Sequence, residues 1–285
     1  MKKRSNRNLV QRLGFTLLGG VAFFTILPIV LVILYIIYMG LPAITWEFLT
    51  QFPTNGMRSG GIMPAILGTV YLTMVTTLLC VPLGIAAAIY LAEYATENKF
   101  TRAIRLALIT LAGIPSVVYG LFGLGMFVLF FQMGTSILAA SLTLSIMTLP
   151  VVITTSEEAL RSVPQAFRTV SISLGATRWQ TIRRIVLPEG QPGILTGIIL
   201  GLERAIGETA PILFTGAVFS LPSLPSSLLS PTMALPYHLY VISTQVPEMP
   251  LDIQYGTALV LMMIVLVLNL IATFIRARAR AKRQW

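Results

Sequence analysis

Residues 157–188 read EEALRSVPQAFRTVSISLGATRWQTIRRIVLP, a polar stretch that separates two strongly apolar parts of the chain. Its apolar side chains recur three or four residues apart in two groups: Val163, Phe167, Val170 and Leu174, then Trp179, Ile182 and Val186. This spacing places each group on one face of a helix. Gly175 separates the groups, and Pro188 ends the second, because proline lacks an amide donor and clashes with the preceding turn. The stretch therefore predicts two short amphipathic helices joined at a glycine.

Two interpretations fit the predicted helix pair. The helices could form a docking element, whose apolar face is gripped by a cytoplasmic motor that pushes on the apolar helices at either end. They could instead be a connector that lies on the membrane surface and only joins two spans, because amphipathic helices commonly lie there. Periodicity alone leaves both interpretations open.

The composition of the chain is that of an integral membrane protein. Of its 285 residues, 55% are hydrophobic and 11% are charged, and the mean hydropathy is +0.84. The net charge of +10 does not indicate nucleic-acid binding, because the basic residues flank apolar stretches instead of clustering on a soluble domain. The single cysteine, Cys80, excludes an internal disulfide, and the single histidine, His238, belongs to no group with metal-ligand spacing.

Six apolar stretches are each long enough for a helix that crosses a bilayer, which needs about 20 residues. They cover residues 13–39, 62–92, 106–131, 135–155, 190–219 and 256–275, and Pro115 interrupts the third. A basic segment, 1–12, precedes the first stretch, and a basic tail, 276–285, follows the last. The first stretch is longer than the hydrophobic region of a signal peptide, so we expect it to remain as a span.

The basic residues predict the orientation of the spans. All but two of the 20 Lys and Arg residues lie in the N-terminal segment, in the connector after the second span, in the 157–188 stretch and in the tail. Cytoplasmic loops carry an excess of these residues, so we expect both termini and the 157–188 stretch in the cytoplasm. That is the side on which a motor finds ATP.

The sequence predicts a transport subunit and not an enzyme. It has no glycine-rich loop followed by Lys and Ser or Thr to cradle nucleotide phosphates, so any ATP must be bound by another chain. Its serines have no histidine in the same span to activate them, so we expect no catalytic residues. Glu157 and Glu158 stand beside Arg161 at a predicted helix end, which favours a solvated carboxylate pair.

The fifth apolar stretch carries charges near its centre. Arg204 lies about midway along it, where a charge is costly and should face protein or a water-filled path. Glu208 follows four residues later on the same helix face, whereas Glu203 points elsewhere. Arg204 could line a translocation path that favours an anion, with Glu208 holding or releasing it. Alternatively, the two residues could form a structural ion pair that locks the span to its neighbours. Pro211 could let the helix bend.

The 157–188 stretch resembles the EAA motif of the permease subunits of ABC importers. Four of its residues fall at the family spacing, but Thr169, Val170 and Ser171 replace the Glu-Ala-Ala of the motif, so its acidic residue is absent. In such permeases this loop inserts into a cleft on the ATPase subunit. The residues that this resemblance implies for ATPase coupling are Gly175, Ala176, Trp179, Ile185, Leu187 and Pro188.

Further stretches resemble the phosphate transport permeases of this family, the PstA group. The fifth span contributes residues 204–211, RAIGETAP. The other stretches are 68–72, GTVYL; 81–94, VPLGIAAAIYLAEY; 113–120, GIPSVVYG; 157–160, EEAL; and 174–179, LGATRW. Several motifs in the family order, over residues 61–216, make the resemblance specific. Glu203 departs from the pattern, because a small residue is expected there.

The resemblance implies a fold and a function. The fold would be the all-α, six-helix membrane core of type I ABC importers (MetI-like), with a permease domain over residues 62–275 and coupling helices within 157–188. The function would be uptake of inorganic phosphate, with Arg204, Glu208 and Glu203 along the translocation path. Pro211 and Pro115 would be helix hinges, and no cofactor is expected.

The resemblance also implies partners and a location. The partners would be a homologous second permease subunit (PstC-like), two ATP-binding subunits (PstB-like), a phosphate-binding protein (PstS-like) that meets the loops 40–61 and 220–255, and membrane lipid. The location would be the inner membrane of a bacterial cell. Three other functions stay open. The first is an ABC permease for another oxyanion, such as molybdate or sulfate. The second is a secondary transporter, which would show inverted repeats and no motor-docking stretch. The third is an intramembrane enzyme acting on lipid, which would show paired catalytic residues at matching depth.

Overall fold

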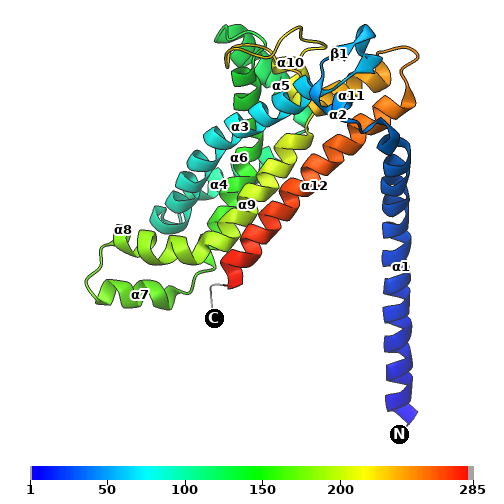
Figure 1. The fold of residues 1–285 in the computed structure, drawn as a ribbon. Coiled ribbons are helices and arrows are strands. Elements are labelled where there is room, and N and C mark those ends of the chain that lie inside the picture. The colour runs from blue at the N-terminus through cyan, green and yellow to red at the C-terminus, as the bar shows by residue number, and fades with distance from the viewer. Residues whose placement is uncertain (1, 282–285) are drawn as a thin grey trace.

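The structure is a computed structural model that describes residues 2–281, so Met1 and the end of the predicted basic tail, 282–285, lie outside the described residues. Five helices are long and apolar enough to cross a membrane, and a bent pair of shorter helices makes a sixth candidate span. Figure 1 shows most of these helices side by side in an inclined bundle. The predicted all-α membrane fold is confirmed.

The centre of the bundle is α6 (Ile137–Arg161). It packs between α3 (Met63–Ile89) and α9 (Leu187–Gly207), and α12 (Leu251–Ala281) packs on α9. Buried residues occur along almost the whole of α6, from Ile137 to Leu160. α6 is therefore packed against neighbouring elements from one end of the bundle to the other.

Val152 of α6 contacts both neighbouring helices at once. A Cβ atom added at Gly84 of α3 would lie 2.7 Å from one Val152 methyl, and one added at Gly201 of α9 would lie 2.8 Å from the other. Small residues at helix contacts let the backbones of membrane helices approach closely. The two glycines thus set the separation of α3 and α9 from α6.

The third predicted span, 106–131, is two helices at an angle. α4 (Lys99–Ala112) and α5 (Ser116–Gly123) are bent by 101°. Ile114 precedes a proline and is thereby disfavoured in the helical conformation, which separates the two helices. The break falls beside Pro115, where the sequence predicts an interruption. α4 itself begins before the predicted span.

The fifth predicted span, 190–219, is also broken, at Glu208 and Thr209 just before Pro211. α9 ends at Gly207, Glu208 is extended with φ −76° and ψ 132°, and α10 (Ala210–Thr215) begins after it. Pro211 lies in the first turn of α10, where its missing N–H needs no partner. The expectation that Glu208 continues a face of the same helix is therefore wrong, since the break precedes the proline.

A small cap closes the upper end of the bundle in Figure 1. It is built from the predicted loops 40–61 and 220–255, which are more ordered than expected. Their buried apolar side chains, among them Phe48, Met233 and Leu235, share one core. The cap elements are the 3-10 turn Leu41–Ala43, α2 (Trp46–Thr50), β1 (Pro53–Thr54), β2 (Ser59–Gly60), which pairs antiparallel with β1, and α11 (Leu235–Thr244).

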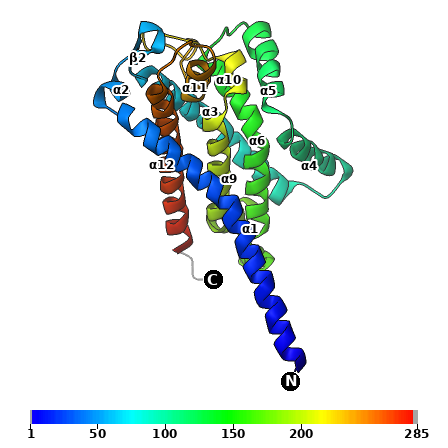
Figure 2. The same ribbon diagram turned by 90° about the vertical axis from the view of Figure 1, so that its right-hand side faces the viewer.

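α1 (Lys2–Gly40) stands apart from the bundle and unites the predicted basic segment and first span in one helix. Figures 1 and 2 together place its lower end away from the other helices. Near its upper end the ring of Tyr35 packs edge-on against Tyr255 of α12, with centroids 5.4 Å apart. Its apolar side chains from Phe15 to Tyr38 are mostly exposed, so α1 adds little to the core.

Candidate functional site

α7 (Gln165–Ser173) lies at the lower end of the molecule in Figure 1 and ends at a glycine joint. Gly175 has a φ of +86°, a left-handed conformation that residues with a Cβ atom rarely adopt. The N–H of Gly175 donates to the carbonyl of Ile172 at 2.9 Å, and the N–H of Ala176 donates to that of Ser171 at 3.2 Å. These bonds satisfy the last carbonyls of α7. The backbone therefore requires the glycine that the sequence places at the joint.

The second predicted coupling helix is the start of span five and not a separate helix. α8 (Arg178–Thr181) continues through the π-helical segment Ile182–Val186 directly into α9. Pro188, in the first turn of α9, does not end the helix, contrary to the prediction. Local π-helical adjustment is one way in which a membrane helix continues past a proline. Any movement of α8 is therefore passed on to α9.

The predicted apolar face of α7 points away from the protein. Phe167, Val170 and Leu174 expose 38%, 58% and 83% of their surface. Val163, predicted on the same face, precedes α7 and is buried in the bundle. The corrected face therefore consists of Phe167, Val170 and Leu174, which we call the α7 face.

The second predicted face is divided between solvent and core. Trp179 is exposed, whereas Ile182 and Val186 are buried. Of the other residues in the motif, Ile185 and Leu187 are half-buried and Pro188 is exposed. The prediction of a single outward face in this segment is wrong, because its aliphatic residues anchor the start of span five.

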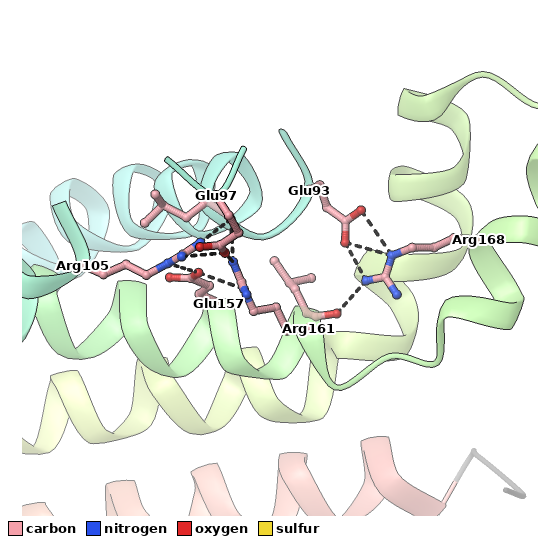
Figure 3. Close-up of polar contacts among 8 residues, drawn as sticks. Glu93, Glu97, Arg105, Glu157, Arg161 and Arg168 are labelled. Atoms are coloured by element: carbon pink, nitrogen blue, oxygen red, sulfur yellow. Dashed lines mark hydrogen bonds and ion pairs between the residues drawn. The ribbon is translucent and has the colours of Figure 1, made fainter. Parts of the chain in front are cut away.

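A buried ion pair ties α7 to the end of α3, as Figure 3 shows. Arg168 of α7 approaches Glu93 to 2.6 Å, and their side chains expose only 11% and 8% of their surface. The Arg168 guanidinium also donates to the carbonyls of Leu160 and Val163, at 2.8 and 2.6 Å. Glu93 lies in the π-helical segment Tyr90–Tyr94 that continues α3. Arg168 therefore joins three elements.

A second set of ion pairs lies beside the first and links α4 to α6 (Figure 3). The Glu157 carboxylate pairs with Arg105 and Arg161, both at 2.9 Å. Both arginines also reach Glu97, at 2.8 and 3.2 Å, so two cations bridge two carboxylates. The Arg105 hydrogen bond, followed by that of Arg161, lowers the pKa of the Glu97 carboxyl below its usual value. The predicted solvated pair is thus wrong for Glu157, which is buried, and Glu158 is exposed.

The charges of span five are held loosely. Arg204 Nη1 donates to the carbonyl of Ala112 at 3.5 Å, and Nε lies 3.7 Å from Glu208 Oε1. The Ala112 carbonyl belongs to the last turn of α4, where backbone acceptors are left without helical partners and a cation is favoured. The Arg204 side chain exposes 28% of its surface, so it is half-buried and not sealed in the core.

Glu203 does not join the other two charges. It lines a cleft of about 240 Å³ between α9 and α12, together with Asn269 and otherwise mostly aliphatic side chains. Arg204 faces α4 instead. Of the three residues predicted along a path, the structure brings together Arg204 and Glu208 and places Glu203 on another side of α9.

Comparison with known proteins decides the family. Residues 80–283 match the family described as binding-protein-dependent transport system inner membrane component. The chain belongs to this family. The permease is accordingly a subunit of an ABC importer and a membrane protein with several spans.

Relatives of the permease include phosphate transport proteins, which confirms the resemblance to the PstA group. It is 35% identical to the probable phosphate transport system permease protein PstA of Methanocaldococcus jannaschii, over 93% of each chain. It is 35% identical to PstA 1 of Mycobacterium tuberculosis, over 91% of this chain and 85% of that protein. It is also 33% identical to the probable ABC transporter permease protein YqgI of Bacillus subtilis, over 95% of this chain and 96% of that protein.

Solved permeases share the fold. A bacterial alginate ABC transporter in complex with a periplasmic protein has a TM-score of 0.64 at 18% identity, over 90% of the permease and 94% of that chain. The MetNI methionine ABC transporter in an inward-facing conformation has a TM-score of 0.61 at 16% identity, over 75% of the permease and 94% of that chain. At such identities the likeness concerns the fold alone, and it confirms the MetI-like architecture.

Sequence reasoning missed the partners of the buried permease arginines. Glu93 and Glu97 are four residues apart, as are Glu157 and Arg161, and such spacing could have indicated charged faces at the helix ends. Nothing in the spacing pairs Arg168 with Glu93, because 75 residues separate them in the chain. Their contact depends on the parallel course of α3 and α6, whose contacts advance together from Leu72 and Ser141 to Gly84 and Val152 and bring the C-terminal ends of both helices to α7.

Proposed function

We propose that the permease carries inorganic phosphate across the membrane as a transmembrane subunit of an ATP-driven importer. The names of several relatives support this substrate, since proteins called PstA are about 35% identical over most of the chain. The observation that carries the proposal is the partly exposed, loosely paired Arg204 guanidinium beside the break between α9 and α10. It offers positive charge to an oxyanion within a span.

The geometry around Arg204 suits transient binding of an anion. A guanidinium presents several N–H donors in a planar fork that matches phosphate oxygens. Phosphate would compete with Glu208, whose carboxylate lies 3.7 Å from Nε, so the anion is held while the carboxylate is displaced and released when it returns. The helix breaks beside Pro115 and Pro211 act as hinges that move α5 and α10 around this point.

The α7 face docks on an ATP-binding subunit. Phe167, Val170 and Leu174 are apolar and exposed, and Trp179 adds an aromatic side chain beside them. Exposed apolar patches of this kind mark contacts with other proteins. Gly175, with Ala176, shapes the joint, while Ile185, Leu187 and Pro188 carry the displacement into span five. ATP is hydrolysed on the partner, two copies of a PstB-like subunit, and Thr169 stands where a family acid would make a further contact.

The remaining partners are assigned to the permease by the two ends of the bundle. From the excess of Lys and Arg at the α7 end we infer that this end and both termini lie in the cytoplasm. The permease would then lie in the inner membrane of a bacterial cell. The cap at the opposite end then receives a PstS-like phosphate-binding protein. A homologous PstC-like permease completes the pathway and adds a second set of charges near Arg204.

The experiment that tests this function is radiolabelled phosphate uptake at micromolar phosphate, in cells that lack the permease and in the same cells supplied with it. We expect uptake that returns with the permease, requires ATP and persists in excess sulfate and molybdate. Supplying the permease without its ATP-binding subunits is the control, because a secondary transporter would still work.

Two outcomes would overturn the proposal in different ways. Entry of molybdate or sulfate without entry of phosphate would keep the ABC permease and reject the substrate. Uptake that continues without the ATP-binding subunits would reject the coupling of this chain to an ATPase and favour a secondary transporter.

A further inference from the structure

The buried side chains that attach α7 to the rest of the protein are polar. Only two of its residues, Arg168 and Ser171, are buried, and both are polar. Its apolar side chains Phe167, Val170 and Ile172 are all exposed. Whatever moves α7 must therefore act on the bundle mainly through these two anchors.

A cleft behind α7 limits the area over which this helix contacts the rest of the protein. About 610 Å³ of space lies between α7, α8 and the end of α3, and its lining includes Gln165, Ile172 and Ala95. Arg168 and Glu93 both line this cleft and pair with each other at its wall. The ion pair is thus a buried contact that borders open space on one side.

All three nitrogens of the Arg168 guanidinium donate hydrogen bonds in this contact. Nε and Nη2 donate to the Glu93 carboxylate, at 3.1 and 2.6 Å. Nη1 donates to the Val163 carbonyl, and Nη2 also donates to the Leu160 carbonyl in the last turn of α6. A lysine offers one flexible ammonium in place of a planar fork and cannot reproduce this set of bonds.

The two polar anchors connect α7 to different spans. Arg168 reaches the end of α3, which is span two, and the end of α6, which is span four. Ser171 shares a hydrogen bond of 2.9 Å with Thr181, which leads through the π-helical segment into span five. Arg178 of α8 adds a bond to the Glu93 backbone carbonyl and lies over the Tyr94 ring, at 4.9 Å.

We propose that Arg168 is a positioning residue that transmits the displacement of α7 to spans two and four through Glu93 and the end of α6. The proposal rests on the proposed function, because it takes α7 as the element that an ATP-binding subunit moves. With the pair intact, α7 and the ends of three spans move as one body. Without the fork, α7 keeps its link to span five, and its connection to the lower end of span two is reduced to the contact of Arg178 with the Glu93 carbonyl and the Tyr94 ring.

The test compares the Arg168→Lys variant with the unmodified transporter. Each is purified as the complete complex and reconstituted in lipid nanodiscs and proteoliposomes. Phosphate transported per ATP hydrolysed should fall about tenfold, within the usual range for coupling between distant sites, while basal ATP hydrolysis and subunit composition stay unchanged. Arg102→Lys is the matched control, since Arg102 is an exposed arginine of α4 outside the ion pairs described above. Glu93→Gln should act like Arg168→Lys, and the double variant should be no worse than either, because both remove one link.

A distance measurement tests the link between α7 and span two and does not depend on phosphate as the substrate. Spin labels at Ser173→Cys and Thr96→Cys, in a Cys80→Ala background, report the separation of α7 from the connector after span two. With ATP added, the intact pair should keep one narrow distance, and Arg168→Lys should broaden or shift it. Failure of phosphate uptake in the unmodified complex would reject the substrate but leave this result standing.

Three results would overturn the role of Arg168. The first is wild-type transport per ATP in Arg168→Lys, and the second is an unchanged distance distribution in that variant. The third is loss of the ATP-binding subunits in both Arg168→Lys and Glu93→Gln, which would make the pair an assembly contact.

Discussion

Two arginines of this permease differ in how completely their donors are satisfied. Arg168 is buried, with four distinct acceptor atoms within 3.3 Å. Arg204 has one hydrogen bond at 3.5 Å and one ion pair at 3.7 Å, and it is partly exposed. A buried cation whose three nitrogens are all hydrogen-bonded holds structure together, whereas a loosely held cation retains donors for a ligand. The same residue type therefore serves as a link at one site and as a candidate anion contact at the other.

Arg204→Ala should lower phosphate uptake about tenfold, which is 1.4 kcal/mol, because one partly exposed charge is removed from the path. Arg204→Lys should keep much of the uptake, since it preserves the charge. Uptake is measured in cells, together with co-purification of the other subunits. If Arg204→Ala dissociates the complex instead, the ion pair with Glu208 is structural and the path role is rejected.

Gly175→Val should reduce transport per ATP hydrolysed while the spans still insert. Among residues 2–281, no atom lies within 4 Å of a Cβ added at Gly175, so the penalty is conformational. A left-handed backbone costs roughly 1–2 kcal/mol for residues other than glycine, and the α7 joint would relax to another shape. Gly175→Asn is the graded control, because asparagine tolerates this conformation better. Normal coupling in Gly175→Val would reject the role of the joint.

At the scale of elements, apolar length identified the spans, and the breaks within them were harder to place. Pro115 was predicted to interrupt span three and does so, because the proline ring disfavours a helical conformation of the preceding Ile114. Pro188 was predicted to end a helix, but a π-helical segment carries the chain past it. Glu208 was placed on a helix that ends one residue earlier. Sequence spacing shows where a proline is, but not whether neighbouring packing will absorb it.

The local stability of α11 should decrease as the pH falls. Burial lowers the pKa of His238 to about 4, and Nδ1 has no hydrogen-bond partner within the described part of the chain. The unfolded state takes up a proton near pH 6.5 that the folded state refuses, so stability is complete above that pH and is lost between 6.5 and about 4.

Hydrogen exchange of the α11 amides measures this effect in the purified complex. We expect protection to fall by about 2 kcal/mol between pH 7.5 and pH 5, from the size of the pKa shift. His238→Leu should remove most of that pH dependence, because no group remains to be protonated there. An equal loss of protection in both proteins would assign it to other groups.

At the scale of the whole molecule, composition and charge predicted more about the fold and its orientation than about any single site. Six apolar stretches gave the membrane fold, and the basic residues gave an orientation that is still a prediction. The EAA-like spacing located α7 and Gly175, but the burial of Val163, Ile182 and Glu157 depends on how α3, α6 and α9 pack. Contacts between residues far apart in the chain have no periodic signature, so the ion pairs stayed hidden.

The orientation can be measured with single cysteines in a Cys80→Ala background. Ser226→Cys in the cap region should react with a membrane-impermeant maleimide in intact cells, because that end faces outward. Ser173→Cys in α7 should react only after the inner membrane is permeabilised, because the basic end faces the cytoplasm. The reverse pattern would invert the topology and remove the α7 face from the side that contains ATP.

The contact of Val152 with Gly84 and Gly201 has an evolutionary consequence. One side chain fills the space that two glycines leave on two different helices, so the three positions cannot drift independently. Among aligned relatives, alanine or serine at either glycine position should accompany a residue smaller than valine at position 152. Pairs of substitutions at these sites should therefore be correlated, and a lineage that enlarges all three should be absent.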